Sequence, residues 1–223
     1  MAGDESNAAI WREYDLSFRE DAHQLLAWGY LAARHLIAPE REETEITGFI
    51  AEAIRAKLNS PDIEERFDRY GLQEDNPVAG EGRIGKRRVR IDIIIESSFR
   101  PRHKPRPQYI FEAKRLCRPN QTLGDYLGGE GILRFLQGRY AADCPEVAMV
   151  GYVQTDTISY WAIALEKRFD EDSANQFRIT EKLSKADIIS HLADEWISKH
   201  QRESQMPITV FHIFLDCSAL SNQ

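Results

Sequence analysis

The sequence predicts an α/β fold, in which a mixed central β-sheet is flanked by helices. Short runs rich in β-branched or apolar residues at about 87–96, 108–115 and 147–154 have the composition of strands. Segments with helical spacing of apolar residues lie between and around them. A strand, helix, strand and helix follow one another in the second half of the chain, and this order favours a parallel crossover.

The composition is typical of a globular chain. Of 223 residues, 42% are hydrophobic and 10% aromatic, which argues against disorder. We expect a polar N-terminal arm at residues 1–20 and a single domain over 21–223. No apolar run approaches the roughly 20 residues of a membrane helix. The start of the chain lacks the basic and apolar regions of a signal peptide, and three scattered cysteines fit a reducing compartment. We therefore expect a cytoplasmic protein.

The N-terminal third is expected to be helical. Apolar spacing predicts a helix from Asp21 that Pro39 ends. A second helix is predicted from Glu40–Glu43 to Leu58, with acidic residues in its first turn. A short helix near 62–70 and a glycine- and proline-containing connection then lead to the first strand.

The remaining elements alternate between strands and helices. In chain order we expect strands at about 87–96 and 108–115, a helix within 122–142 that becomes regular near Glu130, a strand at 147–154, a helix to about 168, a short strand at 177–183, a helix at 185–200 and a strand at 208–215.

Charged residues interrupt the first two strands. Asp92 stands within an isoleucine-rich run, and Glu112 and Lys114 alternate with Ala113 in the second run. Because side chains alternate along a strand, Glu112 and Lys114 emerge on the same face. If the two strands pair as antiparallel neighbours, Asp92 can join them.

Two carboxylates and a lysine in a half-buried sheet need partners. A divalent cation such as Mg²⁺ or Mn²⁺ is the natural partner, because hard cations prefer oxygen ligands. The lysine can then assist a water or stabilise charge on an attacked phosphodiester. The alternative is an edge strand with a solvated face or a structural ion pair.

Asp92 followed by Glu112-Ala113-Lys114 on the next strand resembles the core motif of the PD-(D/E)xK nuclease superfamily. That superfamily includes restriction endonucleases, Holliday-junction resolvases and RecB-like nuclease domains. The proline of the signature is replaced by Ile91. The resemblance covers about residues 43–153 and implies a restriction-endonuclease-like core. It also implies that Asp92, Glu112 and the main-chain carbonyl of Ala113 bind metal and that Lys114 is catalytic.

The resemblance suggests two further groups. A glutamate on the helix before the first core strand often completes the metal site in this superfamily. Glu45 is the best match, with Glu42 and Glu43 as alternates, and stabilisation of the helix dipole is the competing explanation. Gln137 and Tyr140 fit the Gln-x-x-Tyr pattern of RecB-like members, where it positions substrate or active-site groups. Otherwise Tyr140 packs in the core and Gln137 lies on the surface.

The charge of the chain is unevenly distributed. The net charge is −7, yet residues 83–118 hold twelve basic residues against three acidic ones. A basic patch beside the motif would contact phosphates and release counterions, and the alternative is a solvated basic loop. The residues expected to bind DNA are Arg88, Arg90, Arg102, Lys104, Arg106, Arg115 and Tyr140.

These observations predict a metal-dependent endo- or exonuclease that acts on DNA. The chain has no phosphate-binding loop of an ATPase, so we expect a helicase or ATPase partner, or a homodimer that pairs two sites. A prokaryotic or phage defence or DNA-processing role follows only by analogy. The alternatives are a catalytically silent DNA-binding or scaffold subunit, and an interaction protein with an acidic surface.

Overall fold

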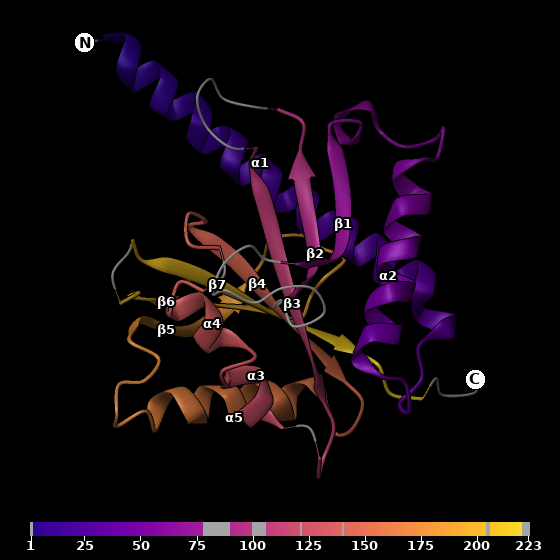
Figure 1. Ribbon diagram of the computed structural model, residues 1–223, viewed down its shortest axis with the longest axis vertical. Coiled ribbons are helices and arrows are strands. Elements are labelled where there is room, and N and C mark those ends of the chain that lie inside the picture. Colours follow the sequence, from indigo (N-terminus) through magenta and orange to yellow (C-terminus); the bar gives the residue numbers. More distant parts are fainter. Residues whose placement is uncertain are drawn as a thin grey trace.

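The protein is an α/β protein with helices packed against a seven-stranded mixed sheet (Figure 1). The computed structural model describes residues 2–77, 90–99, 106–120, 122–139, 141–203 and 206–219, and side chains from residue 10 onward. The order of strands in the sheet is β1-β2-β3-β4-β7-β6-β5. The predicted fold class, a mixed sheet flanked by helices, is therefore confirmed.

Parallel and antiparallel pairs divide the sheet. The strands are β1 (Tyr70–Pro77), β2 (Arg90–Ser97), β3 (Gln108–Leu116), β4 (Glu146–Val153), β5 (Ile179–Ala186), β6 (Glu195–His200) and β7 (Ile208–Asp216). β3 pairs with β4 and β4 pairs with β7 in parallel, and the outer pairs are antiparallel. β3, which carries the Glu112-Ala113-Lys114 motif, thus has an antiparallel neighbour on one side and a parallel one on the other.

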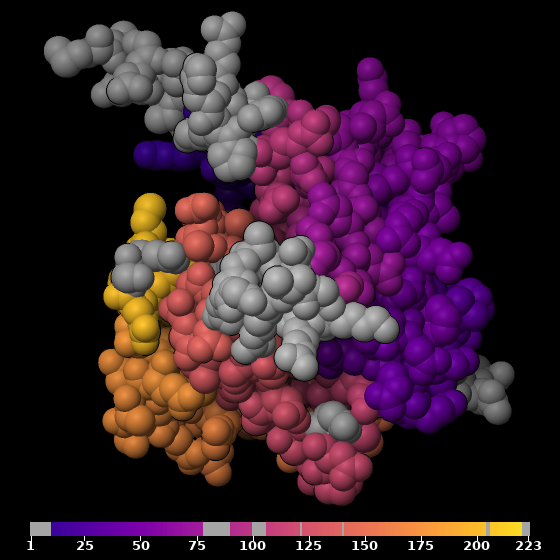
Figure 2. All heavy atoms as spheres, in the orientation of Figure 1, coloured from indigo at the N-terminus to yellow at the C-terminus, as the bar shows by residue number. Residues whose placement is uncertain are grey.

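Helices cover both faces of the sheet. They are α1 (Ala2–Ala33), α2 (Glu43–Leu58), α3 (Leu123–Leu127), α4 (Ile132–Leu136) and α5 (Ile158–Asp170). α1 and α2 pack on one face, and α3, α4 and α5 pack on the other. In the space-filling view, α2 and β1 lie on one side of the molecule and α5 and the C-terminal strands on the other (Figure 2).

Alternation along the strands builds two separate cores. Ile93, Ile95 and Phe111 join the core under α1 and α2, whereas Ile94 and Ile110 join the core under α3 to α5. In the first core, Gly29 lets α1 cross α2 closely, because a Cβ at this position would lie 2.8 Å from the Ile50 carbonyl oxygen of α2. This close approach holds the middle of α2 against α1.

Several predicted elements are confirmed. α2, β2, β3, β4 and β7 lie where the sequence placed them, although residues 87–89 of the first predicted strand are outside the described residues. The parallel pairing of β3 and β4 agrees with the expected crossover.

The predicted arm at residues 1–20 has no boundary at its end, because α1 runs from Ala2 to Ala33 without interruption. Phe18 is buried, and the hydroxyl of Tyr14 donates a hydrogen bond to Ser97 at the end of β2. Aromatic contacts therefore dock at least this part of α1 against the sheet.

Three other predictions are wrong. The segment near 62–70 forms only a 3₁₀ turn at Glu65–Phe67 and is followed by β1, an unpredicted edge strand. The helix predicted at 185–200 is replaced by the end of β5, a turn and β6. The helix within 122–142 is two short helices, α3 and α4, separated by a turn in which a Cβ on Gly131 would overlap the Tyr126 carbonyl at 2.0 Å, and the regular part expected near Glu130 is α4.

Among the described residues, none of the helices combines the length and the apolar composition that spanning a bilayer would require.

Candidate metal and catalytic site

The candidate site lies where β2 and β3 separate. Their paired register ends at Ile93 and Phe111. Beyond that pair, the backbone N–H of Ala113 donates a 2.7 Å hydrogen bond to Oδ2 of Asp92. The Asp92 side chain therefore satisfies a β3 amide that the strand pairing no longer reaches. The prediction that Asp92 joins the Glu112 strand is confirmed.

Glu112 and Lys114 lie together and are nearly buried. Their exposed fractions are 2% and 9%, and Lys114 Nζ is 3.2 Å from Glu112 Oε1. The same ammonium donates to the Ala113 carbonyl at 2.5 Å and to Oε1 of Glu43 at 3.0 Å. Three donors of one ammonium are thus used on three oxygens.

Glu43 is the glutamate of α2 that reaches the site. It is the first residue of the helix, and its Oε2 accepts a 3.1 Å hydrogen bond from the backbone N–H of Arg115. Ala113 and Arg115 present their amides to the same edge of β3, because amide directions alternate along a strand. Asp92 and Glu43 therefore accept hydrogen bonds from successive amides along that edge of β3.

Glu45, the best sequence match for this role, lies elsewhere. It is the third residue of α2, and its Oε2 accepts a 3.0 Å hydrogen bond from the backbone N–H of Glu42 in a capping box. Its other oxygen pairs with Arg41 at 2.9 Å, and 42% of the side chain is exposed. The capping box turns Glu45 back on its own helix, so the choice between the three glutamates falls on Glu43, while Glu42 pairs with Arg115.

Arg134 is a site residue that the sequence analysis missed. Its NH1 lies 3.6 Å from Glu112 Oε1, and its Nε donates a 3.0 Å hydrogen bond to the Gly129 carbonyl. The tight turn at Gly131 starts α4 beside β3 and aims this side chain at Glu112. A basic residue one turn before Gln137, on the helix after the motif strand, was the available signal.

Burial and mutual repulsion raise the pKa values of the acids in the site. Burial, together with the nearby Asp92, raises the pKa of Glu112 to about 8. Burial raises the pKa of Asp92 to about 6, against the favourable charge of Lys114. The pKa of Lys114 is raised, since the surrounding carboxylates outweigh the burial that would lower it. These shifts describe a crowded anionic site that a cation stabilises.

The donor atoms fit a hard divalent cation. Glu112 Oε2 is buried and has no hydrogen-bond partner among the described residues. Within the same residues, no group of three or more His, Cys, Asp or Glu side chains forms a ready-made metal cage. Mg²⁺ needs no such cage, because it commonly binds through one or two carboxylates and keeps several waters. Asp92, Glu112 and the Ala113 carbonyl could supply such a partial set.

The Gln-x-x-Tyr pattern is only partly visible. Gln137 ends α4 and is exposed, so the structure does not bring it into contact with Glu112 or Lys114. Tyr140 lies outside the described residues.

The predicted DNA-binding residues fall into two groups. Arg88, Arg102 and Lys104 lie outside the described residues. Arg90 pairs with Asp75, and Arg106 lies 3.3 Å from Glu96. Arg115 ties β3 to the start of α2, since its NH1 donates to the Arg41 carbonyl at 3.1 Å. The described arginines therefore have partners within the chain.

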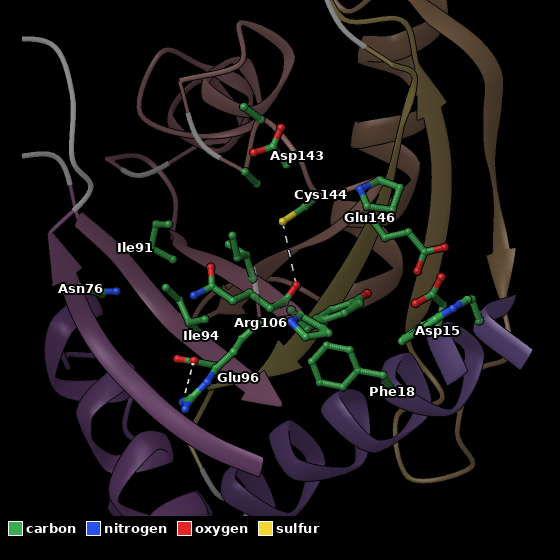
Figure 3. Close-up of a pocket in the computed structure, with 18 of the residues that line it drawn as sticks. Asp15, Phe18, Asn76, Ile91, Ile94, Glu96, Arg106, Asp143, Cys144 and Glu146 are labelled. Carbon is green, nitrogen blue, oxygen red and sulfur yellow. Dashed lines mark hydrogen bonds and ion pairs between the residues drawn. The ribbon is translucent and has the colours of Figure 1, made fainter. Parts of the chain in front are cut away.

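A hollow of about 1100 Å³ lies at the start of β3 (Figure 3). Ile91 and Ile94 of β2 and Phe18 of α1 line it, together with the segment before β4. Glu112 and Lys114 are not part of its lining. Its wall carries four acidic side chains, namely Asp15, Glu96, Asp143 and Glu146, of which Glu96 pairs with Arg106 and Glu146 with Arg19.

Comparisons of the chain with protein-family models, curated proteins and solved structures gave no match.

Proposed function

We propose that this protein is a metal-dependent nuclease with a restriction-endonuclease-like core, which hydrolyses phosphodiester bonds in DNA. The observation that supports this most strongly is the meeting of Asp92, Glu112 and Lys114 at the point where β2 and β3 separate. Buried acids with raised pKa values beside a lysine are typical of functional sites. The superfamily resemblance gives the reaction class.

Each side chain has a role in this proposal. Asp92, Glu112 and the Ala113 carbonyl would hold Mg²⁺ or Mn²⁺, with Glu43 as a further carboxylate. The bound cation would polarise the phosphoryl group and lower the pKa of a water. Lys114 would stabilise the charge that develops on the phosphate. Arg134, at 3.6 Å from Glu112, would orient that carboxylate.

Substrate choice would depend on other components. The proposal includes a helicase or ATPase partner or a homodimer, in a cytoplasmic defence or DNA-processing system. Three free cysteines, Cys117, Cys144 and Cys217, are compatible with a reducing compartment.

A catalytically silent DNA-binding subunit is the second candidate. It is favoured by one observation: Lys114 occupies oxygens of Glu43, Glu112 and Ala113 that a metal would need. In that case the cluster is a buried ion-pair network that holds α2 on β3. DNA binding that is insensitive to Mg²⁺ and to Asp92→Ala would favour this candidate.

The test is cleavage of plasmid, single-stranded DNA and RNA by the purified full chain with Mg²⁺ or Mn²⁺. We expect cleavage of DNA that EDTA abolishes and that Lys114→Ala loses while remaining folded. Ser198→Ala, in a buried cluster away from the site, is the matched control and should cut normally. Equal cleavage by the wild type and by both Asp92→Ala and Lys114→Ala would refute the proposal.

A further inference from the structure

We propose that the ammonium of Lys114 and the divalent cation alternate at the same oxygens, so that metal entry releases Lys114 toward the substrate. This inference rests on the proposed function and concerns the regulation of the same site. Lys114 would then act as a placeholder in the metal-free protein and as a catalytic group only in the loaded one.

The contacts of Lys114 support the placeholder role. Its three donors reach Glu43 Oε1 at 3.0 Å, Glu112 Oε1 at 3.2 Å and the Ala113 carbonyl at 2.5 Å. All three residues are among those proposed to hold the metal. An ammonium with all three donors engaged in this way has none left for a phosphate oxygen.

The two cations exclude one another. Mg²⁺ lies about 2.0–2.1 Å from each oxygen ligand and tolerates little distortion of its geometry. An ammonium held 2.5 Å from the Ala113 carbonyl and 3.2 Å from Glu112 Oε1 would crowd and repel an ion bound to that carbonyl and to either oxygen of the same carboxylate. One of them must leave, and the lysine can do so because it sits on a flexible four-carbon stem.

The remainder of the site can stay in place during this exchange. Glu43 holds the Arg115 amide through Oε2, so its Oε1 can change partners while the carboxylate remains on β3. Asp92 holds the Ala113 amide in the same manner. The backbone edge therefore fixes both acids, and Lys114 is the component that moves.

The test is Mn²⁺ binding measured by calorimetry, which needs no cleavage activity. Lys114→Met removes the competitor but keeps the aliphatic stem, and we expect Mn²⁺ to bind on the order of tenfold or more tightly than to the wild type. Arg41→Met is the matched control, because it also removes one positive charge beside the start of α2, and its guanidinium pairs with Glu45 rather than with any of the three oxygens. Its affinity should change by no more than about threefold.

Two results would overturn the inference. One is a Lys114→Met affinity equal to or weaker than that of the wild type, and the other is an equal gain in Arg41→Met, which would reduce the effect to net charge. If Lys114→Met fails to fold, a crystal structure of the wild type with Mn²⁺ decides. Lys114 Nζ turned away from the Ala113 carbonyl supports the exchange, and the unchanged contact refutes it.

The inference and the proposed function fail in different ways. If Lys114→Met binds Mn²⁺ more tightly but the wild type cuts no nucleic acid, the exchange is supported and the nuclease proposal is refuted. If the wild type cuts DNA only with metal but Lys114→Met has unchanged Mn²⁺ affinity, the nuclease proposal is supported and the exchange is refuted. No Mn²⁺ binding by either protein overturns both.

Discussion

Two buried polar clusters lie in the same sheet and differ in how well their atoms are paired. One is the candidate site on β2 and β3. The other, here called the histidine network, consists of Tyr126, Ser198, His200 and His212. Both place polar groups between hydrophobic layers. Burial alone therefore does not account for the difference in how well their polar atoms are paired.

The histidine network is internally satisfied. The Ser198 hydroxyl lies 2.7 Å from His200 Nε2 and 2.8 Å from His212 Nε2. The other ring nitrogens meet the Phe177 carbonyl and the Tyr126 hydroxyl. Burial lowers the pKa of His200 to about 4 and that of His212 well below its usual value. Neutral rings with paired nitrogens are what a structural network needs.

The candidate site is not satisfied in this way. Glu112 Oε2 lacks a partner among the described residues, and burial raises the pKa of Glu112 to about 8. A buried carboxyl oxygen without a hydrogen-bond partner costs stability. The histidine network thus has the pairing of a structural network, whereas the candidate site keeps a partnerless acidic oxygen that, under the proposed function, a bound cation would occupy.

The largest expected effect is on cleavage. Lys114→Ala and Asp92→Asn should each lower the metal-dependent cleavage rate on the order of 100-fold or more, because they remove charge stabilisation or a metal ligand. Initial rates on plasmid DNA measure this. If either variant retains the wild-type cleavage rate, the candidate site is no more catalytic than the histidine network.

The histidine network should show the opposite result. Ser198→Ala leaves two buried ring nitrogens without their shared partner, so the free energy of unfolding should fall by about 1–3 kcal/mol. Cleavage at a permissive temperature should be unchanged. Urea denaturation measures the first and initial rates the second, and a loss of activity without a loss of stability would contradict the structural role.

The two clusters should respond to pH with opposite signs. Folded Glu112 holds its proton up to about pH 8, whereas the unfolded group releases it near 4.5, so its contribution to stability is lost as pH rises through that window. Folded His200 stays neutral down to about pH 4, whereas the unfolded ring takes up a proton near 6.5. Its contribution is therefore lost as pH falls through that window.

Variants can separate the two windows. Glu112→Gln should flatten the fall in stability between about pH 5 and 8 without added metal, and His200→Gln should flatten the fall below about pH 6.5. Urea denaturation at intervals across pH 4 to 9 measures both slopes. If stability still falls between about pH 5 and 8 in Glu112→Gln as it does in the wild type, the Glu112 carboxyl is not the group responsible for that fall.

The smallest expected effect distinguishes two neighbouring glutamates. Glu43→Gln removes a charge that contacts Lys114 and should change Mn²⁺ affinity by about threefold or more. Glu45→Gln changes an exposed capping residue and should leave the affinity unchanged. Calorimetry on both variants measures this, and a larger effect at Glu45 would restore the original sequence match.

The motif was predictable because local pattern and strand geometry agree there. An isoleucine-rich run with one aspartate and an alternating Glu-x-Lys strand fix which side chains share a face, whereas the antiparallel pairing of the two strands is seen only in the structure. The choice of Glu43 over Glu45 was harder, since both suit a helix start. The spacing from Glu42 to Glu45 resembles that of a capping box, and this signal could have reserved Glu45 for the helix.

The errors in the fold have similar physical causes. Ile188, Ile189, Leu192 and Trp196 have helical spacing, yet β6 gains its stability from pairing with β7, which a local pattern does not reveal. β1 is a polar edge strand and carries little hydrophobic alternation. Arg134 reaches Glu112 only because of the turn at Gly131, so its role depends on tertiary structure.

The most direct test of the account is the unfolding free energy of the wild type and of Glu112→Gln, each with and without Mn²⁺. Because a ligand that binds only the folded state stabilises it, Mn²⁺ should stabilise the wild type, and the variant should lose most of this gain. Equal stabilisation of both proteins, or of neither, would contradict the claim that the buried carboxylates form a cation site.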